Sequence, residues 1–132
     1  MIAGHVECGN GVAMMGGVGV HHFVTIGDYA YIGGYSRIHH DVPPFVKIDG
    51  ADRVRALNNV GLKRHGFSEQ DIDALEDAAR RLFFGREKPF ALVLAEIGEN
   101  PELNPNVKLM IDFLHRRNAG RHGRYLESQR VK

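Results

Sequence analysis

The chain has 132 residues, of which 43% are hydrophobic, and its 17 Lys and Arg nearly balance its 16 Asp and Glu. This is the composition of one globular domain or two small ones, and its balanced charge gives no reason to expect a nucleic-acid partner. The lone Cys8 excludes an intrachain disulfide, no apolar run reaches the roughly 18 residues of a membrane span, and no signal peptide is visible, so we expect a cytoplasmic protein.

The first third of the chain repeats with a period of six residues. Apolar residues recur at every sixth position, namely Ile2, Cys8, Met14, Val20, Ile26, Ile32 and Ile38. Small or β-branched residues follow four positions later, at Val6, Val12, Val18, Val24, Ala30, Ser36 and Val42. Repeats of this kind form a prism in which each hexad supplies one short strand and one corner. A β-meander would instead need period-two alternation and hairpin turns.

The pattern therefore predicts a left-handed parallel β-helix of hexapeptide repeats over residues 1–45. Three hexads close one coil of the prism, so the seven hexads make 7/3 coils. The first residue of each hexad is expected to point into the core. Glycines are expected to relieve the turns, where a positive φ is cheap only without a Cβ.

Two prolines follow the last hexad, in the sequence Asp41-Val42-Pro43-Pro44. Because proline has no N–H to donate to a neighbouring strand, we expect the regular stack to end here. Residues 46–67 are interpreted as a connecting loop, which holds a short turn of helix at most before residue 61.

The remaining residues, 68–132, are predicted to form a small helical domain. Ser68 is a helix N-cap followed by an acidic first turn, and Gly85 ends that helix. Two further helices are expected over about 89–97 and 105–118, each beginning near a proline. From residue 115 onward six Arg or Lys stand against one Glu, and this basic segment is expected to be a solvated, partly frayed tail.

Several motifs around the repeat resemble one family of enzymes. The most specific is Asn58-x-x-Gly61-Leu62-Lys63-Arg64, and the others are Ala3-Gly4-His5-Val6, Val20-His21-His22-Phe23 and Asp41-Val42-Pro43-Pro44. Together they resemble the acyl-carrier-protein:UDP-N-acetylglucosamine O-acyltransferases of lipid A biosynthesis. The resemblance runs from residue 2 to about residue 120 and covers the C-terminal half of such an enzyme.

The resemblance implies a homotrimer with active sites between neighbouring β-helices. It implies transfer of a 3-hydroxyacyl group from acyl carrier protein to the 3-hydroxyl of UDP-N-acetylglucosamine, without a cofactor. The family's general base is a histidine in the coil that would precede Ala3-Gly4-His5, and this chain begins after it. We therefore expect either a fragment of a longer protein or a degenerate paralogue, inactive by itself.

The resemblance also assigns roles to individual residues. Gly4 would donate its backbone N–H to the thioester oxyanion, and His5 would position the sugar and support the base. His21 and His22 would contact the nucleotide sugar, where His22 replaces a more usual glutamine. Asn58 and Arg64 would bind the UDP moiety, and the Lys63-Arg64 pair next to the Ser68 cap would form a cradle for its diphosphate.

By the same resemblance the acyl chain lies in a groove between β-helices. Gly34 matches the residue that limits acyl length, and Tyr31 is a neighbouring candidate wall. A glycine at this place would leave room for a longer 3-hydroxyacyl chain.

Two other interpretations concern the histidines and the loss of the base. His21 and His22 precede His39 and His40 by one full coil of three hexads, so stacked histidines could hold a metal, as in the hexapeptide carbonic anhydrases. Asp41 is the one carboxylate at an obvious supporting position, so we expect no metal. A non-catalytic trimeric scaffold or nucleotide-sugar-binding module is the alternative to an acyltransferase.

Overall fold

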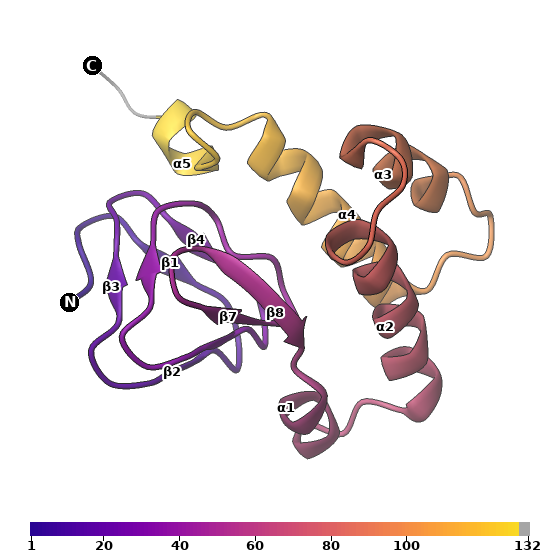
Figure 1. Cartoon of the computed structure of the whole chain (residues 1–132), viewed down its shortest axis with the longest axis horizontal. Helices are drawn as coiled ribbons and strands as arrows, with labels where there is room; N and C mark the ends of the chain where they lie inside the picture. Colours follow the sequence, from indigo (N-terminus) through magenta and orange to yellow (C-terminus); the bar gives the residue numbers. More distant parts are fainter. Residues whose placement is uncertain (130–132) are drawn as a thin grey trace.

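The computed structural model describes residues 1–129, which form a stack of short strands and a group of helices beside it (Figure 1). The strands are β1 (Glu7–Cys8), β2 (Ala13–Met14), β3 (Gly19–Val20), β4 (Thr25–Ile26), β5 (Tyr31–Ile32), β6 (Arg37–Ile38), β7 (Val46–Asp49) and β8 (Arg53–Leu57). The helices are α1 (Asn59–Arg64), α2 (Glu69–Phe83), α3 (Phe90–Gly98), α4 (Pro105–Asn118) and α5 (Tyr125–Ser128).

The first six strands form three parallel pairs, one on each face of a prism. β1 pairs with β4, β2 with β5 and β3 with β6. In each pair the partners are separated by three hexads, as in Cys8 with Ile26 and Val20 with Ile38. The parallel coils and their step of three hexads, predicted from the repeat, are therefore confirmed.

The core of the prism is filled from the second coil onward. Val20, Ile26, Ile32 and Ile38 are at most 4% exposed, whereas Ile2 is 52% exposed and Cys8 is also exposed. The prediction that all seven first positions point into a filled core is thus wrong for the first coil. Within the described residues that coil has a neighbouring coil on one side only, so its apolar side chains lie at an open end.

Non-glycine residues occupy many of the turns with positive φ, contrary to our expectation. His5, Phe23, Tyr29, Tyr35 and Phe45 have φ between 58° and 72°. The rings of His5 and Phe23 stack on each other, and so do those of Tyr29 and Phe45. Each stacked pair offsets part of the roughly 1–3 kcal/mol that a left-handed backbone costs.

Gly27 is required for a different reason, close approach between coils. A Cβ at this position would lie 2.5 Å from the nitrogen of Pro44. No side chain fits at this separation, so glycine allows two backbones to stack.

The stack continues past the two prolines, so the predicted stop at Pro43 and Pro44 is wrong. Val42 pairs with Ile26, and Ile48 pairs with Ile32, each across a separation shorter than three full hexads. Two backbone N–H groups hydrogen-bond the preceding coil. The Val42 N–H donates to Thr25 O at 2.9 Å, and the Phe45 N–H donates to Asp28 O at 2.8 Å. The prolines lie between these donors and remove neither bond.

The interpretation of residues 46–67 as a loop is also wrong, because they contain β7, β8 and α1. β7 joins the stack beside β5, and β8 pairs with β7 in an antiparallel hairpin. The alternation of Val46-Lys47-Ile48-Asp49, followed by a turn at Gly50 and a second alternating run, carries the signal of a hairpin. The hairpin lies on the same face as β2 and β5 and contacts α2.

The three predicted helices are confirmed as α2, α3 and α4. The Ser68 hydroxyl accepts a hydrogen bond from Asp71 N at 3.1 Å and so caps α2. Asn104 caps α4 by accepting from Asn106 N and Val107 N. The helices pack on one another through buried residues such as Leu75, Val93 and Met110.

The expected frayed tail is instead packed against the coils as far as the structure describes it. The Arg124 guanidinium donates to His39 O at 2.7 Å, and its side chain is 10% exposed. The Asp41 carboxylate accepts from Thr25 N at 2.7 Å and from Tyr125 N at 2.9 Å. A buried carboxylate that needs two backbone donors holds this segment in place. Residues 130–132 of the predicted tail lie outside the described residues.

A cavity of about 300 Å³ lies where the coils meet the C-terminal segment, lined in part by His40, Asp41, Asp52 and Arg117. Burial lowers the pKa of Arg117, although Asp41 and Asp52 oppose this shift. Burial also raises the pKa of Asp41, against the opposing effect of the Tyr125 and Thr25 N–H groups. No helix among residues 1–129 is long and apolar enough to cross a membrane.

Candidate functional site

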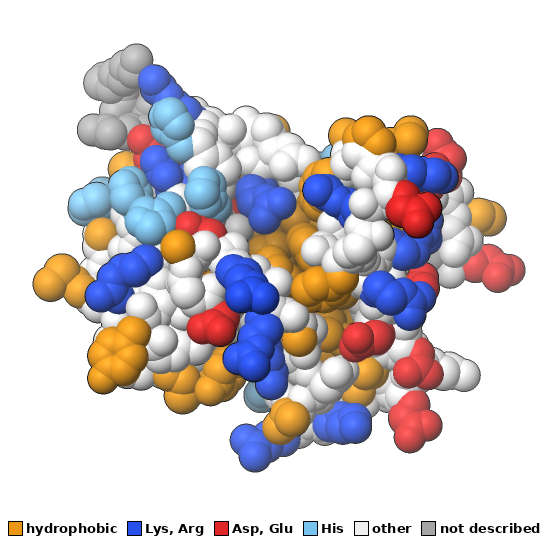
Figure 2. All heavy atoms as spheres, viewed as in Figure 1, with side chains coloured by type: hydrophobic (Ala, Val, Ile, Leu, Met, Phe, Trp, Pro, Cys, Tyr) orange, Lys and Arg blue, Asp and Glu red, His pale blue; other side chains and the backbone are white. Residues whose placement is uncertain are grey.

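Five histidines lie along one corner of the prism. We call this corner the histidine corner, and it comprises residues 4–5, 21–23 and 39–40. Figure 2 shows histidine side chains gathered at one edge of the coil region. His5 and Phe23 occupy equivalent positions in successive coils, and their nearly parallel rings stack with centroids 5.0 Å apart. The repeating coil therefore places residues that are three hexads apart in contact along this corner.

The Gly4 backbone and the His22 ring are directly bonded. Gly4 N donates to His22 Nδ1 at 3.1 Å, and both residues are exposed. A backbone N–H can only donate, so Nδ1 of His22 carries the lone pair and the neutral ring has its proton on Nε2.

His21 has the opposite tautomer. Its Nδ1 lies 2.9 Å from His22 O, and a carbonyl can only accept, so Nδ1 carries the proton. The lone pair of His21 is then on Nε2. The His21 ring lies 5.8 Å from that of His22 and 6.4 Å from that of His39, which continues the row of histidines into the next coil.

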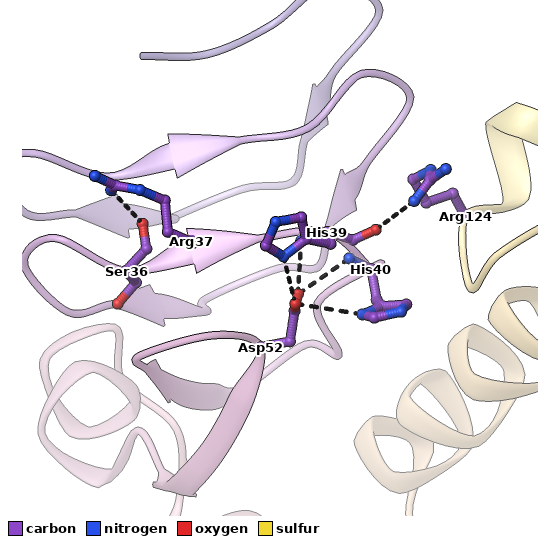
Figure 3. Close-up of polar contacts among 6 residues, drawn as sticks. All are labelled: Ser36, Arg37, His39, His40, Asp52 and Arg124. Carbon is purple, nitrogen blue, oxygen red and sulfur yellow. Dashed lines mark hydrogen bonds and ion pairs between the residues drawn. The ribbon is translucent and has the colours of Figure 1, made fainter.

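Asp52 holds the last two histidines of the corner, a contact that we did not predict (Figure 3). Its carboxylate accepts from His39 N at 2.7 Å and His40 N at 3.0 Å. It also bonds His39 Nδ1 at 2.9 Å. Burial alone would raise the pKa of Asp52, but these contacts hold its pKa below the usual value. Recognising the β7–β8 hairpin, whose turn contains Asp52, would have been needed to find this contact from the sequence.

Metal binding was one interpretation of the stacked histidines. Within residues 1–129, no three or more His, Cys, Asp or Glu side chains are grouped so that they could hold a metal ion.

Asn58 and Arg64 lie at the two ends of α1, away from the histidine corner. Asn58 is 6% exposed, and its side chain accepts from Gly61 N at 3.2 Å and donates to Tyr29 O at 2.9 Å. It therefore fastens α1 to the corner that contains Tyr29. Arg64 is exposed in the last turn of α1.

Of the two residues of the expected diphosphate cradle, Lys63 lines a hollow beside the Ser68 cap. The hollow between α1 and α2 is lined by Asn59, Lys63, Glu69, Ile72, Asp73 and Glu76. One lysine there faces three carboxylates, and such a lining does not favour a diphosphate. Any contact of Arg64 with a phosphate must therefore be made on another side of α1.

Gly34 lies at the third corner, and its backbone does not require glycine. Its φ is outside the left-handed region, and the positive φ of this turn belongs to Tyr35. A Cβ at Gly34 would lie 3.6 Å from Gly16 O and 3.9 Å from Met15 Cβ, which are ordinary contacts. Tyr31 is half-buried in β5, where the Lys47 ammonium lies 5.7 Å from its ring.

The structure thus brings together four of the predicted residues, Gly4, His5, His21 and His22. Asn58 and Arg64 are placed at a second corner, and Gly34 at a third. Each corner is separated from the next by one face of the prism.

Comparisons with known proteins place the chain among acyltransferases. A sequence-family model described as "Udp N-acetylglucosamine O-acyltransferase; Domain 2" matches residues 41–123. An acyl-[acyl-carrier-protein]–UDP-N-acetylglucosamine O-acyltransferase from Synechocystis sp. is 40% identical over 125 residues, which are 92% of this chain and 45% of that protein. The chain therefore spans about half the length of the curated relatives that it matches.

Solved structures give the same result. The UDP-N-acetylglucosamine acyltransferase from Campylobacter jejuni superposes with a TM-score of 0.78 at 34% identity, over 86% of this chain and 44% of the other. The Arabidopsis UDP-N-acetylglucosamine acyltransferase gives a TM-score of 0.79 at 32% identity, over 84% of this chain and 41% of the other.

Proposed function

Because the chain belongs to the UDP-N-acetylglucosamine O-acyltransferase family, we propose that it supplies the acceptor-binding part of such an enzyme. The reaction moves a 3-hydroxyacyl group from an acyl-carrier-protein thioester to the 3-hydroxyl of UDP-N-acetylglucosamine. The family match over residues 41–123 carries this proposal, and the name shared by its relatives supports it. The lone cysteine fits a cytoplasmic, reducing setting.

The histidine corner would serve the acyl-transfer step. The Gly4 N–H would stabilise the oxyanion that forms when the sugar oxygen attacks the thioester carbon. His5 would position the sugar, and His21 and His22 would contact the nucleotide sugar. The tautomer of His21 supports its role, because Nε2 on the exposed ring can accept a hydrogen bond from a sugar hydroxyl. The base that removes the hydroxyl proton would be the general-base histidine that the family resemblance implies.

Asn58 and Arg64 would bind the UDP moiety, with Asn58 also holding α1 in place. They lie at a different corner from the histidines, so a site that uses both sets must combine two chains. This separation supports a homotrimer in which neighbouring prisms meet at their corners.

The acyl chain would lie between neighbouring prisms, with Tyr31 in its wall and Gly34 at its far end. The prism would be left-handed. Its domain, expected over residues 1–45, would also include the β7–β8 hairpin that extends the stack, and residues 68–132 would form a second domain. Figure 2 shows Lys and Arg side chains along the boundary between the coils and the helices. This positive surface supports docking of the acidic acyl carrier protein.

Calorimetric titration of the chain with UDP-N-acetylglucosamine tests this proposal. Arg64→Ala removes a charge-assisted contact, so affinity should fall by about 10- to 150-fold, or about 1.5–3 kcal/mol. Arg80→Ala is the matched control, because Arg80 is also exposed on a helix and pairs with Asp77 at 2.7 Å. Equal affinities of the native chain and Arg64→Ala would remove Arg64 from the site.

A non-catalytic nucleotide-sugar-binding module is the second candidate. One observation favours it: the Gly4 N–H, which an oxyanion would need, already donates to His22. A protein of this kind would bind UDP-N-acetylglucosamine but transfer no acyl group even when the preceding coils are supplied.

A further inference from the structure

The C-terminal segment contacts the histidine corner at its last coil. The Arg124 guanidinium donates to His39 O at 2.7 Å, as Figure 3 shows. The Tyr125 N–H donates to the Asp41 carboxylate at 2.9 Å. We call residues 121–125 the clamp, because they bond the backbone of the corner and the side chain that follows it.

The guanidinium of Arg124 is held in one place by two partners. Its side chain is 10% exposed, and the Glu127 carboxylate lies 3.5 Å from its Nε. An arginine withdrawn from water is costly unless its charge and its N–H groups have partners. Glu127 compensates the charge, and His39 O accepts from Nη1. A buried, planar donor of this kind also fixes the carbonyl that it bonds.

His39 is in turn bonded on its other side and lies next to His21. The Asp52 carboxylate accepts from the backbone N–H of His39 at 2.7 Å and bonds its Nδ1 at 2.9 Å. The His39 ring lies 6.4 Å from that of His21, whose N–H donates to Ile38 O at 2.8 Å. A displacement of His39 would therefore change the space that the exposed His21 ring occupies.

Asp41 extends the contact with the clamp to the preceding coil. Its Oδ2 accepts from Tyr125 N, and its Oδ1 accepts from Thr25 N at 2.7 Å. Thr25 follows shortly after residues 21–23 of the histidine corner. One carboxylate thus joins the clamp to two successive coils at the corner that carries the histidines.

We propose that Arg124 is a positioning residue for the nucleotide-sugar site, because its bond to His39 O sets the place of the His21 ring. The inference rests on the proposed function, in which His21 contacts the nucleotide sugar. Arg124 then affects binding without touching the ligand, by fixing a side chain that does.

Calorimetric titration of the full chain with UDP-N-acetylglucosamine separates positioning from folding. Arg124→Met keeps a long apolar stem but has no donor for His39 O, whereas Arg124→Lys keeps a charged donor. Arg124→Met should lower the affinity about 3- to 10-fold, which is the value of one neutral hydrogen bond, with an unchanged number of sites. Arg124→Lys should bind more tightly than Arg124→Met. Partial unfolding would instead reduce the number of sites and leave their affinity unchanged.

NMR of the histidine rings tests the same contact without a ligand. At about pH 8, above the ordinary pKa of histidine, Arg124→Met should shift or broaden the ring signals of His39 and His21. Arg121→Met is the matched control, because it removes an exposed arginine from the same clamp. It should leave both rings unchanged. The amide signals of α2 and α3 verify that each variant folds.

Two results would overturn the positioning role. One is equal affinity of Arg124→Met and Arg124→Lys for the sugar nucleotide, and the other is a set of His21 ring signals that Arg124→Met leaves in place. Failure of the proposed function looks different. If the native chain does not bind UDP-N-acetylglucosamine, the function is contradicted, and the ring signals alone decide the positioning role. If the native chain binds but the His21 signals do not respond, the positioning role alone is contradicted.

Discussion

Asp52 stabilises the end of the histidine corner only while its carboxylate is ionised. Its pKa is held below the usual value, so the folded state favours the charged form. This contribution to the free energy of unfolding is therefore complete above the ordinary aspartate pKa, about 3.9. It is lost as the pH falls through the lower pKa of the folded state.

Asp52→Asn should lower the free energy of unfolding by about 1–3 kcal/mol at neutral pH. The amide has a single accepting oxygen, so it cannot accept from His39 N, His40 N and His39 Nδ1 together. The difference from the native chain should shrink in strong acid, where Asp52 is protonated too. Urea denaturation at several pH values measures both effects. A stability difference that does not change with pH would show that the charge of Asp52 is irrelevant.

Gly34 has space for a side chain, which makes its proposed role in acyl length testable. Its φ lies outside the left-handed region, and the nearest atoms to an added Cβ are 3.6 Å or more away. A methionine should therefore be tolerated by the coil and should extend into the proposed groove.

A chimera that places the N-terminal half of a curated relative before this chain allows Gly34→Met to be assayed with donors of several lengths. Each buried methylene is worth about 0.8 kcal/mol, so loss of a space two carbons deep should change the preference by about tenfold toward the shorter donor. If the variant remains folded and its preferred length is unchanged, Gly34 does not limit the acyl chain.

Among the elements, the coils depend on close approach at particular glycines. Gly27→Ala would place a Cβ 2.5 Å from Pro44 N and 2.7 Å from Pro44 Cα. Both are backbone atoms, so the coils must move apart, and we expect a loss of about 1–3 kcal/mol in the free energy of unfolding.

Gly16→Ala is the matched control, because a Cβ there meets nothing within 4 Å and φ is not positive. This change should be neutral or should stabilise by up to about 1 kcal/mol. Urea denaturation of both variants provides the comparison. Equal stabilities would show that Gly27 is not needed for the approach of the coils.

Elements with a regular period could be predicted from the sequence, and those at the junctions could not. The hexads predicted parallel coils, and the Ser68 cap with its apolar stripe predicted α2. The sequence prediction lacks the β7–β8 hairpin, because two consecutive prolines without N–H donors indicate the end of a regular stack. Their missing donors cost nothing where Val42 and Phe45 supply the bonds to the coil below.

The candidate site shows the same division between local pattern and tertiary contact. The step of three hexads placed His21 and His22 one coil before His39 and His40, and the His21 and His39 rings are neighbours in the structure. It could not place Asp52 on His39 or Arg124 on His39 O, because those contacts are formed by a hairpin turn and a C-terminal segment with no shared period.

At the scale of the whole molecule, the predicted site residues are distributed over three corners of a prism, in a chain that spans about half the length of the relatives. Under the proposed function, a complete site would require corners from more than one chain, together with the general-base histidine that the family resemblance implies. The isolated chain is therefore expected to bind UDP-N-acetylglucosamine and to transfer little or no acyl group.

Acyl transfer by the chimera tests the central claim most directly. The chimera is incubated with a 3-hydroxyacyl-carrier-protein donor and UDP-N-acetylglucosamine, and the 3-O-acylated sugar nucleotide is quantified, with sedimentation to verify a trimer. Our account predicts product from the trimeric chimera, less product from its Arg64→Ala variant, and little or none from the isolated chain. A trimeric chimera that binds the sugar nucleotide but forms no product, or an isolated chain that matches the chimera's rate, would contradict it.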